Sequence, residues 1–190
     1  QDFKSRFAGS ILGLLWAFIQ PLAMMLILWF VFSVGLKIAL TDNIPFPVWF
    51  FSAMILWNFI SDFILTATNV FGEYDYLVKK INFKISILPV VKMVSSLILH
   101  FVFVFILAGI LMFYGYYPNF YWLQSIYFLL GAMVLASGIA WMTASINVFM
   151  KDASQIVGIF IQFGFWLTPI VWPVTFIPDK YLILLKLNPV

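Results

Sequence analysis

The chain has 190 residues, of which 65% are hydrophobic and 9% are charged, and its formal net charge is +3. An average soluble domain has roughly 25% charged residues, and a soluble fold of this size would still expose about 30% of its chain's surface to water. A soluble enzyme, a disordered tail and a nucleic-acid-binding module are therefore excluded, and lipid must surround most of the chain.

Residues 1–11 are predicted to form a short amphipathic helix in the membrane interface. Phe3, Phe7 and Ile11 recur every four residues, while polar residues occupy the positions between them. This spacing places the apolar side chains on one face of a helix, as in helices that lie flat on a membrane. The alternative is an ordinary positively charged flank of the first membrane span.

Five membrane-spanning helices are predicted, because a span needs about 20 mostly apolar residues. The longest stretch without Asp, Glu, Lys or Arg runs from residue 93 to residue 150, and a turn-like sequence at 114–119 divides it into two spans. Continuous apolar runs without strand-like alternation favour helices over a barrel. The predicted spans are 12–36, 47–71, 90–114, 121–148 and 153–172.

The distribution of basic residues predicts a cytoplasmic N-terminus. With that orientation, seven of the ten Lys and Arg residues lie on the cytoplasmic side, and only Lys37, Lys180 and Lys186 lie outside. Cytoplasmic loops of membrane proteins carry such an excess of basic residues.

The loop at 72–89 is the largest polar segment on the predicted cytoplasmic side. It begins with acidic residues, Glu73 and Asp75, and continues with lysines. This order of charges suits the dipole of a short helix, on which a cytoplasmic partner could dock. The alternative is a charged loop that only sets the topology.

Residues 169–190 are predicted to form an outer re-entrant segment. Pro169, Pro173 and Pro178 are too closely spaced for a regular helix. Non-helical backbone at membrane depth is tolerated only where protein buries it or where it lines a watery cavity. A plain interfacial loop is the alternative.

Two ionisable residues are predicted to lie inside spans. Asp62 and the single histidine, His100, have similar depths on adjacent antiparallel spans and could pair, and Gln162 lies at a comparable height. Ionisable groups in membranes face partners or water and are functional candidates. The alternative is a contact that only joins two helices. One histidine without further ligands, in a chain without cysteine, predicts no metal site.

Small and aromatic residues are the remaining candidates. Ala132, Ala136, Ala140 and Ala144 repeat every four residues and predict close helix packing. Aromatic faces can stack on sugar rings, although bulk that faces lipid is the commoner explanation. The tryptophans considered as channel residues are Trp16, Trp57, Trp141 and Trp166.

Four blocks of sequence stand in a recognisable order: RFAGSILGLLWAFIQP, VKKINFKISILPVVK, NVFMKDASQIVGI, and FWLTPIVWP with LNPV. In these blocks the chain resembles the type-2 ABC transporter permeases that export cell-surface polysaccharides. The resemblance implies an all-α polytopic fold with six helices, the last following Val190, in a homodimer in the bacterial inner (cytoplasmic) membrane. It also implies two separate ATP-binding subunits, which hold ATP and magnesium, so that this chain has no catalytic residue and no cofactor. The chain itself has no phosphate-binding loop sequence.

The resemblance also implies residue roles within a single permease domain, 1–190. The loop at 72–89 would be the coupling helix, and its ATPase contacts would be Glu73, Tyr74, Asp75, Tyr76, Lys79 and Lys80. Lys4, Arg6 and Phe7 would flank the entry for an anionic lipid-pyrophosphate head.

The resulting prediction is a permease subunit of an ATP-driven exporter of lipid-linked polysaccharide, such as O-antigen, capsule or teichoic acid. The alternatives are an ABC exporter of drugs or simple lipids, a gradient-driven carrier that uses Asp62 and His100, and a membrane-embedded transferase.

Overall fold

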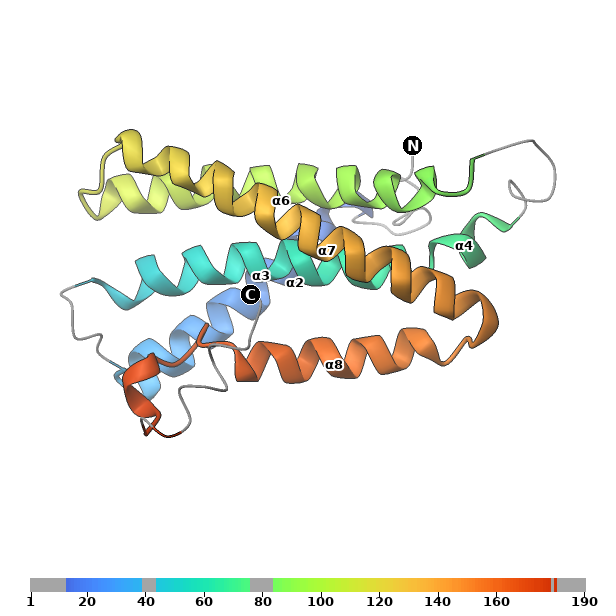
Figure 1. Cartoon of the computed structure of the whole chain (residues 1–190). Helices are drawn as coiled ribbons and strands as arrows, with labels where there is room; N and C mark the ends of the chain where they lie inside the picture. The colour runs from blue at the N-terminus through green and yellow to red at the C-terminus, as the bar shows by residue number, and fades with distance from the viewer. Residues whose placement is uncertain (1–12, 39–43, 76–83, 179, 181–190) are drawn as a thin grey trace.

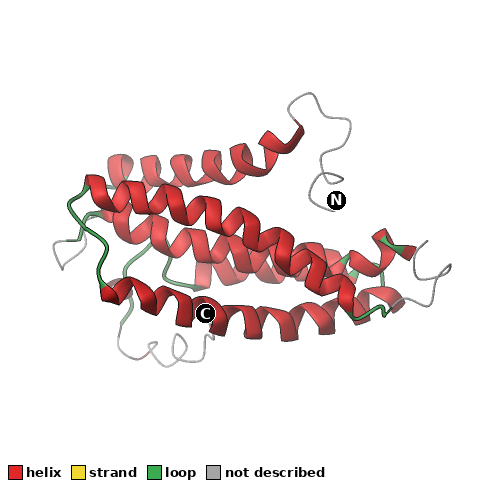
Figure 2. Cartoon of the chain, turned by 90° about the horizontal axis from the view of Figure 1, so that it is seen from above, coloured by secondary structure: helices red, strands yellow, loops and turns green. Residues whose placement is uncertain are grey.

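The computed structural model describes residues 13–38, 44–75, 84–178 and 180, and within these ranges it contains helices and no strand (Figures 1 and 2). The long helices are α2 (Trp16–Trp29), α3 (Phe46–Thr68), α6 (Ile87–Phe113), α7 (Gln124–Phe149) and α8 (Ala153–Leu167). The short elements are η1 (Gly13–Leu15), the π-helical turn η2 (Phe30–Gly35), α4 (Val70–Glu73), η3 (Phe120–Leu123) and η4 (Val174–Phe176).

Four helical segments are long and apolar enough to cross a membrane: α2 with η2, α3, α6, and η3 with α7. The prediction of an all-α polytopic membrane protein is therefore confirmed. In the region of the predicted fifth span, 153–172, the structure has the shorter apolar helix α8 of 15 residues, which ends at Leu167. At about 1.5 Å per residue it reaches about 22 Å, less than the roughly 30 Å of a bilayer's hydrocarbon core.

The proline after α8 explains why this helix is short. A residue before proline is restricted to extended conformations, and Thr168, directly before Pro169, has a ψ of 135°. From there the chain turns back into the protein, where Ile170 and Val171 are buried beside Met25 of α2. The first part of the proline-rich segment is thus enclosed by protein, as non-helical backbone at membrane depth requires.

Helix α3 is the centre of the bundle. It packs against α2, α6, α7 and α8. In Figure 1, α6 and α8 lie on opposite sides of α3, and α7 crosses α3 diagonally from the α6 side to the α8 side. Its most apolar stretch is 56% buried, against 17% for each of the other spans. Of the candidate residues on α3, Trp57 is therefore buried and Asp62 is half-buried.

The alanine stripe brings α7 close to α3. Ala136, Ala140 and Ala144 are completely buried, and the first two pack in one cluster with Phe63 and Ala67 of α3. The close approach predicted from the four-residue spacing is confirmed, because no larger side chain separates the two backbones.

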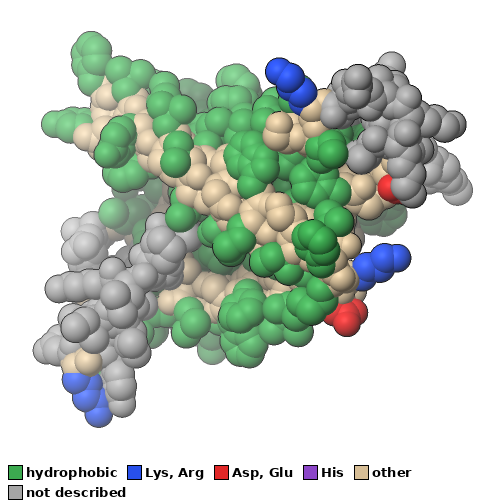
Figure 3. All heavy atoms as spheres, turned by 45° about the vertical axis from the view of Figure 1, so that its right-hand side comes forward, with side chains coloured by type: hydrophobic (Ala, Val, Ile, Leu, Met, Phe, Trp, Pro, Cys, Tyr) green, Lys and Arg blue, Asp and Glu red, His purple; other side chains and the backbone are tan. Residues whose placement is uncertain are grey.

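Large apolar side chains cover the outside of the bundle. Phe105 on α6 is 77% exposed and Phe160 on α8 is 71% exposed. Figure 3 shows hydrophobic side chains spread over one face of the molecule, with the few charged ones toward its margins. Such an extended apolar surface fits contact with lipid.

Candidate functional site

Part of the predicted site lies outside the described residues. This applies to the amphipathic helix at 1–11 and to much of the predicted coupling helix at 72–89. The individual residues concerned are Lys4, Arg6, Phe7, Tyr76, Lys79 and Lys80. The described part of the coupling segment begins with Glu73, Tyr74 and Asp75, which lie at one end of the bundle with α4; we call this the α4 end (Figure 1).

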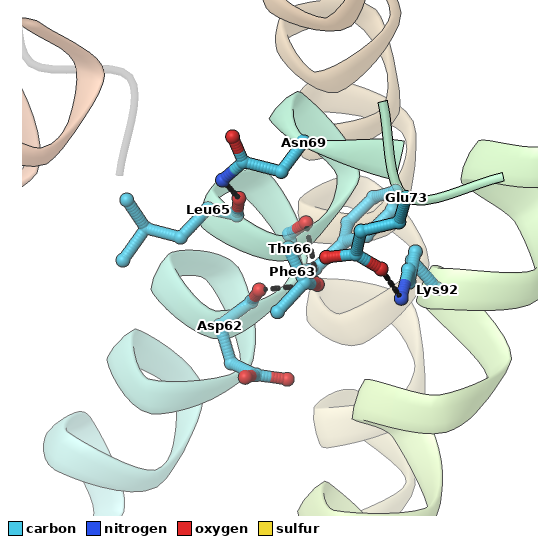
Figure 4. Close-up of polar contacts among 7 residues, drawn as sticks. All are labelled: Asp62, Phe63, Leu65, Thr66, Asn69, Glu73 and Lys92. Carbon is cyan, nitrogen blue, oxygen red and sulfur yellow. Dashed lines mark hydrogen bonds and ion pairs between the residues drawn. The ribbon is translucent and has the colours of Figure 1, made fainter. Parts of the chain in front are cut away.

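A buried ion pair is the strongest polar feature of the α4 end. Lys92, on the second turn of α6, is only 1% exposed, and its Nζ donates to Glu73 Oε2 at 2.6 Å (Figure 4). The Tyr74 ring centroid lies 5.3 Å from the same Nζ. A buried ammonium is costly without a partner. The carboxylate and the aromatic face therefore compensate for the water that Lys92 has lost.

Two of the predicted ATPase contacts thus touch the bundle itself. The Glu73 side chain is 48% exposed, and the carboxylate that it presents to Lys92 is already engaged. Tyr74 is half-buried beside it, whereas Asp75 is exposed. Of the predicted contacts that the structure describes, Glu73 and Asp75 are exposed and Tyr74 is half-buried.

A second polar cluster joins α3, α7 and α8 at the α4 end. The Thr68 and Thr143 hydroxyls are 2.8 Å apart, and Asn147 Nδ2 donates to the Thr68 carbonyl at 3.0 Å. Asn147 Oδ1 accepts from the Ser154 backbone N–H at 3.2 Å. Because one asparagine bonds the end of α3 and the start of α8, it fixes these helices to the end of α7.

A wide cavity opens beside these two clusters. It has a volume of about 1020 Å³, and Glu73, Asp75, Asn147 and Lys151 are among its lining residues. Phe149, also in its wall, is 92% exposed. The cavity offers both charged groups and an aromatic side chain to a partner at this end of the bundle.

Asp62 and His100 line one small cavity, of about 230 Å³, between α2, α3 and α6. Asp62 accepts a hydrogen bond from Ser96, which lies one helical turn before His100 on α6. The buried Nδ1 of His100 has no hydrogen-bond partner, and the imidazole centroid lies 5.3 Å from that of the Phe59 ring. The pairing of Asp62 with His100 stays a prediction.

Three channel candidates lie together in another cavity. Trp57, Gln162 and Trp166 line a space of about 520 Å³ that α2, α3 and α8 enclose. Trp57 is only 9% exposed, whereas Trp166 is 53% exposed. The other two candidates lie elsewhere: Trp16 is not among the lining residues, and Trp141 donates to the Ser86 carbonyl at 3.3 Å.

Metal binding finds no support in the part of the chain that the structure describes. There, no three His, Cys, Asp or Glu side chains come close enough to hold an ion.

Sequence reasoning missed the structural roles of Lys92, Thr68, Thr143 and Asn147. Lys92 counted only as a basic residue that sets the topology. Lys92 lies on the second turn of α6, and the acidic Glu73 precedes it at the end of α4. This arrangement is a signal from which the ion pair could have been predicted. Asn147 stands in the NVFMKDASQIVGI block, but the sequence does not indicate which helices it joins.

Comparisons with known proteins give matches that cover the whole chain. The family model described as ABC-2 type transporter matches residues 1–190. The O-antigen export system permease protein RfbA of Myxococcus xanthus is 28% identical over this whole chain and 72% of its own length. Two proteins of that name from Klebsiella pneumoniae are 25% and 24% identical with the same coverage. The chain therefore belongs to the ABC-2 type transporter family, and it is a multi-pass transport subunit.

Proposed function

We propose that this chain is the permease subunit of an ATP-driven exporter of lipid-linked cell-surface polysaccharide of the O-antigen class. The observation that carries the proposal is its alignment, over its whole length, with three permeases named for O-antigen export. The buried polar clusters at one end of an otherwise apolar bundle fit a membrane channel that is driven from that end.

A separate subunit would bind and hydrolyse ATP. This chain has no phosphate-binding loop sequence, so ATP and magnesium belong to the partner. The partner would dock at the α4 end, where Asp75 and the exposed Phe149 border the cavity of about 1020 Å³. With the basic residues counted as above, this end is cytoplasmic, the N-terminus lies on the same side, and the membrane is the bacterial inner membrane.

The polysaccharide would pass between two copies of this chain. The cavity with Trp57, Gln162 and Trp166 opens between α2 and α8, which leave much of their surface uncovered. Tryptophan faces stack on sugar rings, and the glutamine amide can bond hydroxyl groups. This face of the bundle is the proposed channel wall.

The first experiment is to purify the full-length protein from native membranes in a mild detergent. A stoichiometric ATP-hydrolysing subunit is expected to accompany it. A protein that purifies without any ATPase in several detergents would overturn the proposal and favour the carrier or transferase alternatives.

A second experiment tests the channel wall. Trp166→Ala should reduce polysaccharide export by about two- to tenfold, the equivalent of about 0.5–1.5 kcal/mol for an aromatic contact. Phe128→Ala is the matched control, because Phe128 is 61% exposed on α7 and does not line that cavity. Equal export by both variants would contradict the placement of the channel.

The other functional classes are less well supported. Membership of the ABC-2 type family favours ATP-driven transport over a gradient-driven carrier that uses Asp62 and His100. A transferase would need clustered acids, yet the Glu73 carboxylate is bound to Lys92. An exporter of drugs or simple lipids would lose no transport on Trp166→Ala beyond that of the control.

A further inference from the structure

The ion pair between Lys92 and Glu73 joins two parts of the chain that have different proposed tasks. Glu73 stands at the start of the coupling segment, and Lys92 belongs to α6, which crosses the membrane. The distance from Lys92 Nζ to Glu73 Oε2 is short, at 2.6 Å, and the Lys92 side chain is only 1% exposed to water. It is therefore a firm attachment of the segment to the bundle, unlike an exposed surface ion pair.

Several neighbouring contacts hold the same attachment. The Tyr74 ring covers the ammonium at 5.3 Å, and Tyr74 N–H donates to the Val70 carbonyl at 3.1 Å. Val70 is completely buried in a cluster with Leu88 of α6 and Ala144 of α7. The short helix α4, which precedes Tyr74, is thus packed against both α6 and α7.

We infer that Lys92 is a positioning residue that couples ATP hydrolysis to export. It fastens the start of the coupling segment to α6, so that the two move as one body when the ATP-binding subunit pushes on the segment. Glu73 and Tyr74 act in this attachment and not as direct ATPase contacts. The inference rests on the proposed function.

The first test compares export per ATP hydrolysed in vesicles that contain the full-length permease and its ATPase. Lys92→Met and Glu73→Gln should each lower this ratio about fivefold or more, the lower range of measured couplings between sites. The double variant should be no worse than either single variant, because both remove one interaction. Lys92→Arg should restore the ratio, since a guanidinium can also pair with the carboxylate.

The control is Lys37→Met, which removes an exposed lysine just after η2 and far in sequence from the coupling segment, and which should leave the ratio unchanged. A Lys92→Met variant with the ratio of wild type would overturn the inference. So would a loss in Glu73→Gln alone, because Glu73 would then act through the ATPase and not through Lys92.

A second test remains decisive even if the single variants are poorly assembled. Residues 1–190 contain no cysteine, so Glu73→Cys with Lys92→Cys introduces the only thiols into this part of the permease, and any cysteine elsewhere in the full-length protein is replaced by serine. Before the thiols are linked, the double-cysteine variant should hydrolyse ATP with little export. A short bis-maleimide should then join the two thiols and restore export. Failure of the link to form, or a linked protein that hydrolyses ATP without export, would overturn the inference.

Failure of the proposed function gives a different result. If the wild-type complex exports no polysaccharide with ATP, the proposed function falls and the role of Lys92 with it. If the wild-type complex exports normally and the variants do too, only the role of Lys92 is overturned.

Discussion

Replacing Gly164 with alanine tests the contact that holds α8 against α3. A Cβ at Gly164 would lie 3.0 Å from Cη2 of Trp57, closer than nearly all real contacts of this kind. The indole has little room to move, because Trp57 is 9% exposed and its ring lies 6.0 Å from that of Phe165. Gly158, also on α8, is a matched control whose added Cβ would lie 4.0 Å from Leu65 Cδ2, an ordinary distance.

The comparison of the two variants isolates the crowding. Both substitutions gain about 1 kcal/mol of helix propensity, since both glycines lie inside the helix. Crowding at Gly164 should cost about 1–3 kcal/mol, as for other groups forced into a packed interior. At roughly 2–4 °C per kcal/mol for a chain of this size, Gly164→Ala should denature about 2–12 °C below Gly158→Ala.

The assay is the temperature at which the purified full-length protein loses its monodisperse peak in size-exclusion chromatography after heating in detergent. Equal shifts for Gly164→Ala and Gly158→Ala would refute the reasoning, because the crowding would then be absent. A Gly164→Ala variant that is the more stable of the two would place α8 farther from Trp57 than the structure does.

The remaining predictions concern the α7 seam and the polar groups. Ala140→Leu should destabilise the protein by about 1–3 kcal/mol, because Ala140 is completely buried against α3. Val134→Leu, on the exposed side of α7, should not destabilise it. Equal melting temperatures of the two variants would contradict the close packing of α7 on α3. Asn147→Ala should cost about 1–3 kcal/mol, since it removes bonds to α3 and α8, whereas Ser145→Ala removes only a bond within α7. Asp62→Asn keeps an oxygen for the serine on α6, so it should cost about 1 kcal/mol and preserve ATP-driven export; export in wild type that stops when the proton gradient is dissipated would argue against this.

The fold was predictable wherever the signal is local. The spacing of Ala136 and Ala140 is set by the sequence alone, and so is the end of α8 before Pro169. The π-helical turn η2 was not predicted. In it Leu36 N–H donates to the Val31 carbonyl at 2.8 Å, a five-residue step that depends on how the end of α2 packs and has no fixed residue pattern.

The site was less predictable, because it depends on which residues distant in sequence meet. Glu73 and Lys92 are separated by 19 positions, and only the fold places the ammonium inside the bundle. Asp62 bonds Ser96, one helical turn before His100 on α6, and the sequence alone does not set this register between α3 and α6. A similar depth in the membrane locates the partner of a residue to within about one helical turn of the neighbouring helix. It does not show which residue of that turn makes the contact.

The order of Glu73 and Lys92 along the chain has a consequence for how the protein is made. Glu73 leaves the ribosome before α6 does, so the carboxylate is already present when the lysine approaches the bilayer. A helix that carries a buried positive charge is costly to insert by itself, whereas α6 can enter with that charge already compensated. We therefore expect the two halves of this contact to depend on each other during biogenesis as well as in the finished transporter.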